Sequence, residues 1–301
     1  MKLKHFIGHG GISIAADVGG DPQAAPIVLL HGGGQTRHSW KNAGRRLVAA
    51  GYRVIVPDLR GHGDSAWSPD GHYALESLAE DLRALVATLP APPVLIGASL
   101  GGLTALMAAG GAVPVPARAL VLVDVTPRMN EDGVGRVLAF MSAHPDGFAD
   151  IDAAADAVAH YLPHRPRPSS TAGLAKNLRQ RHDGRFYWHW DPRLLSARGD
   201  DRASDWAKLS ACAARLTLPV LLLRGARSEL VDEEHVRELL SLVPHARAVL
   251  IDDAHHMVAG DDNDNFSAAI LDFLAADVFA SGSAMAPPCT AQGGSRGHPA
   301  A

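Results

Sequence analysis

The sequence predicts an α/β protein built on a mostly parallel sheet with an antiparallel start. Short apolar runs rich in Val, Ile and Leu recur along the chain, and longer amphipathic stretches separate them. The runs are continuous rather than alternating, which is typical of strands covered by helices on both faces. Gly, Pro, Asp or His follows nearly every run, where a strand leaves the sheet and the chain turns.

The predicted elements follow one another in a simple order. Residues 2–7 and 12–16 flank Gly8-His9-Gly10-Gly11, a pattern that predicts an antiparallel hairpin. Amphipathic stretches over 74–89 and 232–243 are long enough to be crossover helices. The strands expected in the parallel part cover residues 27–30, 53–56, 93–96, 119–123, 219–223 and 248–251.

One long region interrupts this alternation. Residues 127–218 contain no strong strand run, only helix-like segments and the aromatic cluster Phe186-Tyr187-Trp188-His189-Trp190. This stretch is too long for a simple loop, so it predicts a helical cap over the carboxyl edge of the sheet. The expected organisation is a core over 1–127 and 210–278, a cap over 128–209, and a disordered tail over 279–301 that is rich in Gly, Ser, Pro and Ala.

Composition and charge exclude several classes of protein. The 301 residues are 47% hydrophobic and 20% charged, which is globular composition, and Lys plus Arg (28) against Asp plus Glu (32) gives a net charge of −4. Without a basic excess, nucleic acid is not an expected partner. Two cysteines cannot build a disulfide framework. Neither a signal peptide nor an apolar run of about 18 residues is apparent, so we expect a soluble, cytoplasmic protein without a membrane partner.

A serine in a strand–turn–helix context is the candidate nucleophile. Gly97-Ala98-Ser99-Leu100-Gly101 follows the strand 93–96 and opens the helix-like stretch 100–109. In this context the Gly-x-Ser-x-Gly pattern is a nucleophile elbow, in which small neighbours allow a sharp turn and expose the serine oxygen. The alternative is an ordinary turn of small residues at the end of a strand.

A serine hydroxyl needs a base to remove its proton, and the chain offers one after its last strand. Asp253-Ala254-His255-His256-Met257 follows the run 248–251. Adjacent side chains in a loop point in different directions, so only one histidine can serve. We expect His256 to be the base and His255 to lie at the surface or the pocket rim.

Two carboxylates are candidates for the acid that orients the imidazole. Asp124 ends the strand 119–123, and Glu229 lies just past the strand 219–223. Asp232 is expected instead to begin the following helix. Both candidates lie at carboxyl ends of strands, where α/β sites assemble. Asp124 is slightly favoured, because a strand end holds a carboxylate more rigidly than a loop does.

The glycine-rich segment His31-Gly32-Gly33-Gly34-Gln35 follows the strand 27–30 and offers open backbone N–H groups. Gly33 and Leu100 are the expected oxyanion donors. His31, Gly34, Trp188 and Trp190 are expected to contact a small-molecule substrate; for the two tryptophans, the alternative is that the aromatic cluster only holds the cap together. The segment matches neither a P-loop nor a dinucleotide-binding pattern, and no convincing metal-ligand spacing occurs, so we expect no cofactor and no metal.

Residues 1–278 resemble the α/β-hydrolase superfamily through the His31–Gly34 segment, the elbow at Ser99 and the His256 segment, in that order. The stretch from Asp58 to Ser65 is similar to the loop after the fourth strand of that family, in which the aspartate is usually structural. Within the superfamily the chain looks most like small cofactor-free bacterial hydrolases labelled esterase, epoxide-hydrolase-like or haloperoxidase-like.

The resemblance implies an eight-stranded sheet, a cap inserted after the sixth strand, and a serine hydrolase that cleaves an ester, lactone or related acyl bond through an acyl-enzyme. The family commonly has its acid after the seventh strand, at Glu229, but some members have it after the sixth, at Asp124. Epoxide and haloalkane hydrolases need a carboxylate nucleophile, which Ser99 argues against. The alternatives are a cofactor-free perhydrolase or acyltransferase, or a sensor that binds a small ligand without turning it over.

Overall fold

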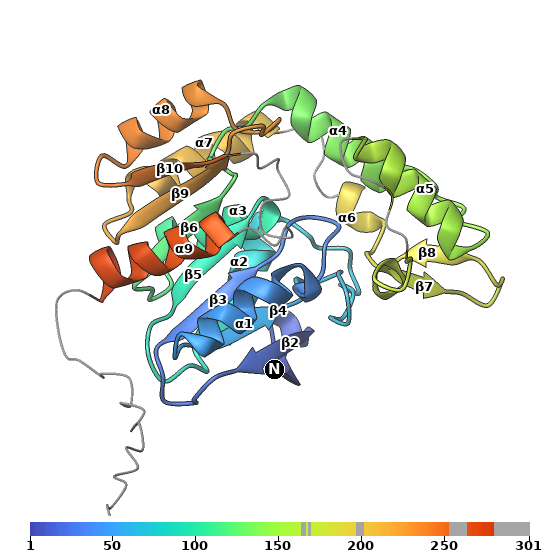
Figure 1. Cartoon of the computed structure of the whole chain (residues 1–301), viewed down its shortest axis with the longest axis horizontal. Coiled ribbons are helices and arrows are strands. Elements are labelled where there is room, and N and C mark those ends of the chain that lie inside the picture. The colour runs from blue at the N-terminus through green and yellow to red at the C-terminus, as the bar shows by residue number, and fades with distance from the viewer. Residues whose placement is uncertain (164–166, 168–169, 197–201, 253–263, 280–301) are drawn as a thin grey trace, which may run out of the picture.

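The computed structural model describes residues 1–163, 167, 170–196, 202–252 and 264–279. Eight strands form one sheet in the order β1-β2-β4-β3-β5-β6-β9-β10 (Figure 1). The β1–β2 and β2–β4 pairs are antiparallel and the remaining neighbours are parallel. The strands are β1 (Lys2–Ile7), β2 (Ser13–Gly19), β3 (Pro26–Leu30), β4 (Arg53–Pro57), β5 (Val94–Ala98), β6 (Ala119–Val123), β9 (Val220–Gly225) and β10 (Arg247–Ile251).

Helices cover both faces of this sheet (Figure 1). On β6, alternate residues contribute to two separate apolar clusters: Leu120 and Leu122 to one, Val121 and Val123 to the other. Both faces of a central strand are therefore buried, which explains the continuous apolar runs. The first cluster includes α2 (Leu75–Val86), α3 (Leu100–Gly110), α7 (Arg202–Ala214) and α8 (Glu233–Leu242), and the second includes α1 (Lys41–Ala49) and α9 (Asp264–Phe273).

The core elements agree with the sequence-based prediction. All six expected parallel strands form, with ends shifted by at most two residues, and the opening hairpin forms with antiparallel register. Asp232 begins α8 as expected, because its carboxylate accepts from the backbone N–H groups of Glu234 (2.8 Å) and His235 (3.1 Å). The expected eight-stranded, mostly parallel sheet with an antiparallel start is confirmed.

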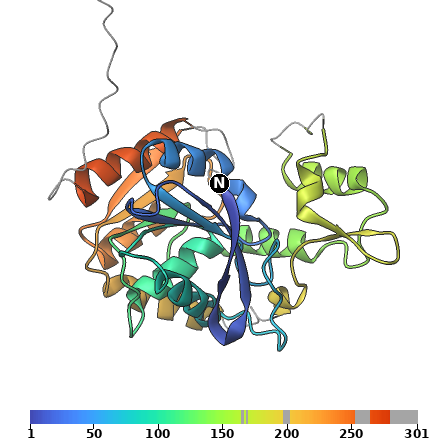
Figure 2. The ribbon, with the colours of Figure 1, turned by 90° about the horizontal axis from the view of Figure 1, so that it is seen from below.

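The cap lies beyond the carboxyl edge of the sheet and stands to one side of the core (Figure 2). It has its own apolar cluster, in which Met141, Phe148, Trp188 and Trp190 take part. It contains an antiparallel strand pair as well as helices, so it is not the purely helical cap that we expected. Its elements are α4 (Glu131–Ser142), α5 (Ile151–Tyr161), the 3-10 turns of η3 (Leu174–Asn177), β7 (Leu178–Gln180), β8 (Phe186–Trp188) and α6 (Arg193–Ser196).

The return from cap to core occurs through α7. This helix packs against α3, and its residues Leu209, Cys212 and Ala213 are buried in the core cluster. The expected boundary between residues 209 and 210 therefore falls inside a core helix. The expected tail lies almost entirely outside the described residues. No described helix combines the length and the apolarity that a membrane crossing requires.

Candidate active site

Ser99 occupies the turn between β5 and α3 with φ 47° and ψ −119°. Residues with a side chain rarely adopt this backbone conformation, and it costs on the order of 1–3 kcal/mol. The surrounding chain holds it in place: the Ser99 N–H donates to Val123 O (3.4 Å) and the Ser99 carbonyl accepts from Leu103 N (3.0 Å). The side chain is half-buried at the N-terminal end of α3.

Two glycines make this turn possible because α3 crosses very close to the strands. A Cβ on Gly97 would lie 2.5 Å from the backbone of Gly101, and a Cβ on Gly101 would lie 2.3 Å from Leu30 O. Neither position can accept a side chain without moving the helix off the sheet. The Gly-x-Ser-x-Gly spacing is therefore a packing requirement of this turn.

Ser99 lines a cavity of about 350 Å³ between the sheet edge and the cap. Residues 32–36 and the elbow form its core side. Trp188 and Trp190 stack on each other on the cap side, with ring centroids 5.0 Å apart and planes at 12°. The cap side is mostly apolar and includes Val137, Phe140, Met141, Leu174, Trp188 and Trp190.

The glycine-rich loop lies directly against the nucleophile. A Cβ on Gly32 would lie 3.4 Å from Ser99 Cβ, and one on Gly33 would lie 3.8 Å from Leu100 Cδ2. Among the described residues, no hydrogen-bond acceptor takes the N–H of Gly33 or of Leu100. Leu100 N–H is also one of the first N–H groups of α3, which have no partner inside the helix. Two such donors beside a serine can bind an oxyanion.

His31 holds this loop from behind. Its Nδ1–H donates to Gly32 O (2.8 Å), and its Nε2 accepts from Leu59 N (2.9 Å). Burial lowers the pKa of the fully enclosed ring, which favours the neutral form that these two bonds require. The ring does not line the cavity, so its position supports a role in shaping the loop and not the substrate contact that we expected. Gly34 does line the cavity.

Asp124 lies beside the nucleophile at the end of β6. The pairing of Ala98 with Val123 puts Ser99 and Asp124 each one residue beyond the last paired position of neighbouring strands. The Asp124 carboxylate is fully buried and accepts from Gly225 N (3.0 Å) and from Ser228 Oγ (2.6 Å). Its φ of 50° lies in the left-handed region that aspartate tolerates better than most residues.

Glu229 is placed differently. Its side chain is 57% exposed and pairs with Arg136 of α4, with 2.8 Å between Nη2 and Oε2. The structure thus brings Asp124 to the nucleophile's edge of the sheet and leaves Glu229 at the surface. His256 and His255 lie outside the described residues. In the described part of the chain, no group of three or more His, Cys, Asp or Glu side chains is arranged to hold a metal ion.

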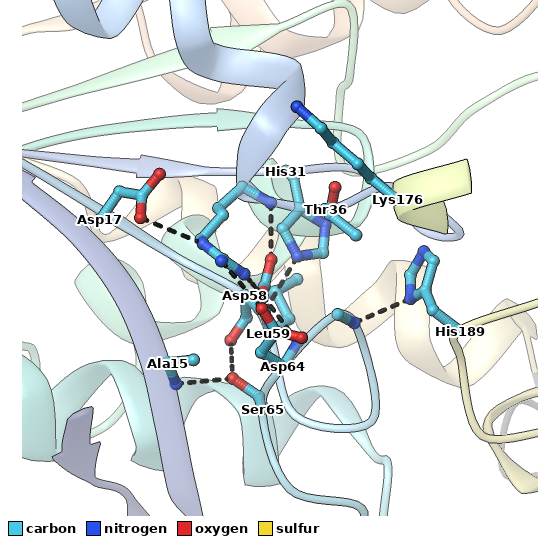
Figure 3. Close-up of polar contacts among 12 residues, drawn as sticks. Ala15, Asp17, His31, Thr36, Asp58, Leu59, Asp64, Ser65, Lys176 and His189 are labelled. Atoms are coloured by element: carbon cyan, nitrogen blue, oxygen red, sulfur yellow. Dashed lines mark hydrogen bonds and ion pairs between the residues drawn. The ribbon is translucent and has the colours of Figure 1, made fainter. Parts of the chain in front are cut away.

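Asp58 anchors the chain that continues from the glycine-rich loop. Its carboxylate accepts from the backbone N–H of Arg37 (2.6 Å) and of Asp64 (2.9 Å), and it also pairs with the Arg37 guanidinium (Figure 3). Arg37 extends the network to Asp17, at 3.2 Å. Asp58 is fully buried and occupied by these contacts, which fits the structural role that the family resemblance implied.

Two further histidines contact the glycine-rich loop, and neither contact is predictable from the sequence. His62 Nε2 accepts from Gly34 N (3.2 Å). His189, from the cap, accepts at Nδ1 from Gly63 N (2.7 Å; Figure 3). Its Nε2 donates to Gly34 O (3.3 Å). Burial is the largest influence on the pKa of His189 and, helped by nearby His31, lowers it to about 3.

The low pKa of His189 makes the stability of the fold depend on pH. The unfolded chain takes up a proton on this imidazole near its ordinary value of 6.5, whereas the folded chain keeps it neutral to about pH 3. The unfolded state binds more protons in that window, so the free energy of unfolding falls by up to about 1.4 kcal/mol per unit of decreasing pH. The free energy of unfolding, measured with urea at several pH values between 7 and 4, should fall less steeply with decreasing pH for His189→Gln than for the parent. Equal slopes would contradict this prediction.

Comparison with known proteins agrees with this geometry. The sequence profile of a family described as alpha/beta hydrolase fold matches residues 25–262. Esterase Rv0045c of Mycobacterium tuberculosis is 33% identical over 247 residues, 79% of this chain and 78% of that protein. The sn-1-specific diacylglycerol lipase ABHD11 of Mus musculus is 29% identical and covers 85% of this chain and 83% of its own length.

Solved structures show the same fold. The structure of E-2-(acetamidomethylene)succinate hydrolase superposes with a TM-score of 0.80 at 24% identity, over 91% of this chain and 99% of that one. That of the M. tuberculosis esterase Rv0045c gives a TM-score of 0.72 at 28% identity and covers 91% of each chain. With a profile match over most of its length and an esterase relative above 30% identity, the chain belongs to the α/β-hydrolase family and is a hydrolase.

Proposed function

We propose that this hydrolase is a serine esterase that cleaves carboxylic esters of small molecules through an acyl-enzyme. The observation that carries the proposal is the position of Ser99, which lies on a strained turn, lines a cavity, directly precedes Leu100 and lies against the glycine-rich loop at Gly32. The resemblance to a mycobacterial esterase at 33% identity supports the same reaction class.

In the first half of the proposed reaction, His256 removes the proton of the Ser99 hydroxyl, and the serine oxygen attacks the ester carbonyl carbon. The carbonyl oxygen becomes an oxyanion, which accepts hydrogen bonds from the N–H groups of Gly33 and Leu100. Asp124 holds the imidazole in the required tautomer and stabilises its charged form. Its carboxylate is itself fixed by Gly225 N and Ser228 Oγ.

In the second half, the tetrahedral intermediate collapses and the C–O bond to the alcohol breaks, with the alcohol taking the proton from His256. Water then attacks the acyl-enzyme while His256 acts as base again, and the same two N–H groups hold the second oxyanion. The carboxylic acid leaves and Ser99 recovers its proton. Apart from the ester and this water, the steps use the side chains of Ser99, His256 and Asp124 and the two backbone N–H groups.

The walls of the cavity define the class of ester. Its volume of about 350 Å³ is at the small end of the range for ligand pockets, about 300–1,000 Å³. The cap side offers aromatic and aliphatic surface, and Trp190 is only 4% exposed. We therefore infer a substrate whose acyl or alcohol group is apolar and modest in size.

The test uses nitrophenyl esters of increasing acyl length and a fluorophosphonate that reacts with activated serines. We expect turnover of short and medium acyl chains, and attachment of the reagent to the peptide that contains Ser99. A chain that hydrolyses none of these esters and leaves the reagent unreacted would exclude the proposed function.

Replacing Trp190 by Ala should change the acyl preference. Trp190 packs on the cavity side of the loop, with its Cζ3 3.4 Å from where a Cβ of Gly34 would lie. Removing the indole enlarges the pocket, so kcat/KM for bulkier acyl groups should rise relative to acetate by roughly 10-fold, the lower end of the effect of one methylene in an apolar pocket. Trp67→Ala, at a 39% exposed tryptophan away from the cavity, is the matched control. An unchanged ranking in both variants would make Trp190 purely structural.

A further inference from the structure

Three imidazoles join the glycine-rich loop to the loop that follows β4. His31 links Gly32 O to Leu59 N. His62 accepts from Gly34 N and donates from Nδ1 to Arg60 O (3.1 Å). His189 links Gly34 O to Gly63 N. Each ring thus bridges one backbone group of residues 32–34 and one of residues 59–63.

The three rings also contact one another. The centroids of His31 and His62 lie 5.1 Å apart, and those of His62 and His189 lie 5.9 Å apart. In each ring one nitrogen accepts from a backbone N–H and the other faces a carbonyl oxygen, so each ring is neutral with a defined tautomer. Each of the three imidazoles therefore has one ring orientation that satisfies its hydrogen bonds, so together they can hold the glycine-rich loop rigidly.

These bonds act on the peptide group that contains Gly33 N–H. A peptide is planar and trans, so the orientation of Gly32 O determines the direction of Gly33 N–H. Gly32 O accepts from His31 Nδ1 (2.8 Å) and from Gln35 N (3.1 Å). Gln35 N–H belongs to the same peptide group as Gly34 O, which His189 holds (3.3 Å). Two hydrogen bonds and two planar peptides therefore connect His189 to Gly33 N–H.

His189 differs from the other two because it comes from the cap. It directly follows β8, is 1% exposed, and its own N–H donates to Asn177 O (3.1 Å). The same hairpin is fixed to the core by Arg179, whose guanidinium pairs with Asp64 at 2.7 Å. The next residue, Trp190, lines the cavity and packs against the other side of Gly34.

We propose that His189 is a positioning residue for ester hydrolysis: by holding Gly34 O it fixes the loop that presents Gly33 N–H to the oxyanion. The cap then completes the oxyanion site as well as shaping the pocket. This inference rests on the proposed esterase function. His189 then affects kcat, whereas the neighbouring Trp190 affects which substrates are accepted.

Two substitutions separate the two hydrogen bonds of His189. The amide of Gln reaches the position of Nε2, so His189→Gln can keep the bond to Gly34 O while losing the acceptor for Gly63 N–H. The shorter Asn reaches the position of Nδ1, so His189→Asn keeps the acceptor for Gly63 N–H and loses the bond to Gly34 O. His182→Asn, at an exposed histidine in the turn of the same hairpin, is the matched control.

The readouts are kcat and KM for a short nitrophenyl ester, and the affinity for a trifluoromethyl ketone, whose adduct with Ser99 carries an oxyanion. We expect His189→Asn to lower kcat by about 10- to 100-fold with little change in KM, because a displaced donor loses contact only with the transition state. Affinity for the ketone should fall by the same factor. His189→Gln and His182→Asn should stay within about threefold of the parent, well below the loss expected for a displaced donor.

The outcomes distinguish this inference from the function on which it rests. If the parent chain hydrolyses none of the esters, the proposed esterase function is excluded. A parent with turnover, together with a folded His189→Asn variant that retains kcat and ketone affinity, would overturn only the role of His189. Equal losses in the Asn and Gln variants with a raised KM would mean that His189 merely holds the cap in place, and would overturn the inference as well.

Discussion

Replacing Ser99 by Ala lowers kcat/KM for ester hydrolysis by roughly 10⁴-fold or more while leaving the fold unchanged. In the proposed mechanism no other group can form the acyl-enzyme, and triad members removed from serine hydrolases cost this much. The residual rate enhancement comes from substrate binding and from the oxyanion donors, which can still assist direct attack of water on the ester. Steady-state turnover of a short nitrophenyl ester measures the loss, and fluorophosphonate labelling of the same peptide should disappear with it.

The fold should survive because alanine keeps the Cβ that this backbone conformation already accommodates. The closeness of α3 to the sheet depends on Gly97 and Gly101, which the substitution leaves in place. Equal urea midpoints for parent and variant check this point. Ser241→Ala, at an exposed serine of α8, is the control that should keep full activity. Ester turnover near the parent level in Ser99→Ala would mean that another residue is the nucleophile.

The parts of the fold that the sequence predicts are those encoded in neighbouring residues. A central strand such as β6 is buried on both faces, so its pattern is a run of apolar residues that needs no partner to be read. The nucleophile elbow is also largely local: its Gly-x-Ser-x-Gly pattern spans five residues, and Gly97 is required by its contact with Gly101 inside the same turn, although Gly101 is required by its close approach to Leu30 of β3. Both could be assigned to residue level from the sequence.

The hairpin of the cap could not be predicted in this way. Strands β7 and β8 have three residues each, too few to show a period of two, and the aromatic residues of β8 are equally compatible with a helix or a core segment. What selects the strand is packing: Trp188 stacks on Trp190 and meets Phe148 edge-on, with centroids 5.1 Å apart. Such contacts across the cap are not visible in a single sequence.

The hydrogen bonds of His189 were missed for a related reason. Its partners Gly63 and Gly34 are 126 and 155 residues away in the sequence, and both offer only backbone groups. Nearly every residue has a backbone N–H and C=O, so residue types do not reveal which of these groups a histidine binds. The sequence therefore shows a histidine between two tryptophans but not its partners. The position of His31 in the glycine-rich segment marks it as a candidate site residue, but its role in shaping the loop depends on its contacts with Gly32 O and Leu59 N in the folded chain.

The choice of acid shows how burial separates two candidates that sequence position cannot. Asp124 and Glu229 both follow strands of the sheet, at its carboxyl edge. In the folded chain the first is fully buried and held by Gly225 N and Ser228 Oγ, whereas the second is 57% exposed and paired with Arg136. Only a buried, fixed carboxylate can hold an imidazole in one orientation.

Exchanging Asp124 for Asn should therefore lower kcat by about 10⁴-fold, because the imidazole would be held in the wrong tautomer. The fold should tolerate the exchange: Asn accepts the left-handed backbone at this position, and its Oδ1 can still accept from Gly225 N. Glu229→Gln removes a charge from a half-exposed ion pair, a contact worth about 1 kcal/mol or less, and should leave kcat within about twofold of the parent.

The two variants form a matched pair, since each replaces a carboxylate by its nearly isosteric amide. Parent-like urea midpoints for both would show that any loss of rate is chemical. If Glu229→Gln abolishes turnover while Asp124→Asn retains most of it, the acid follows β9 and Asp124 is structural. Partial losses of similar size in both would mean that the two carboxylates act together on His256. In that case the double variant must be measured, because the single losses would not add.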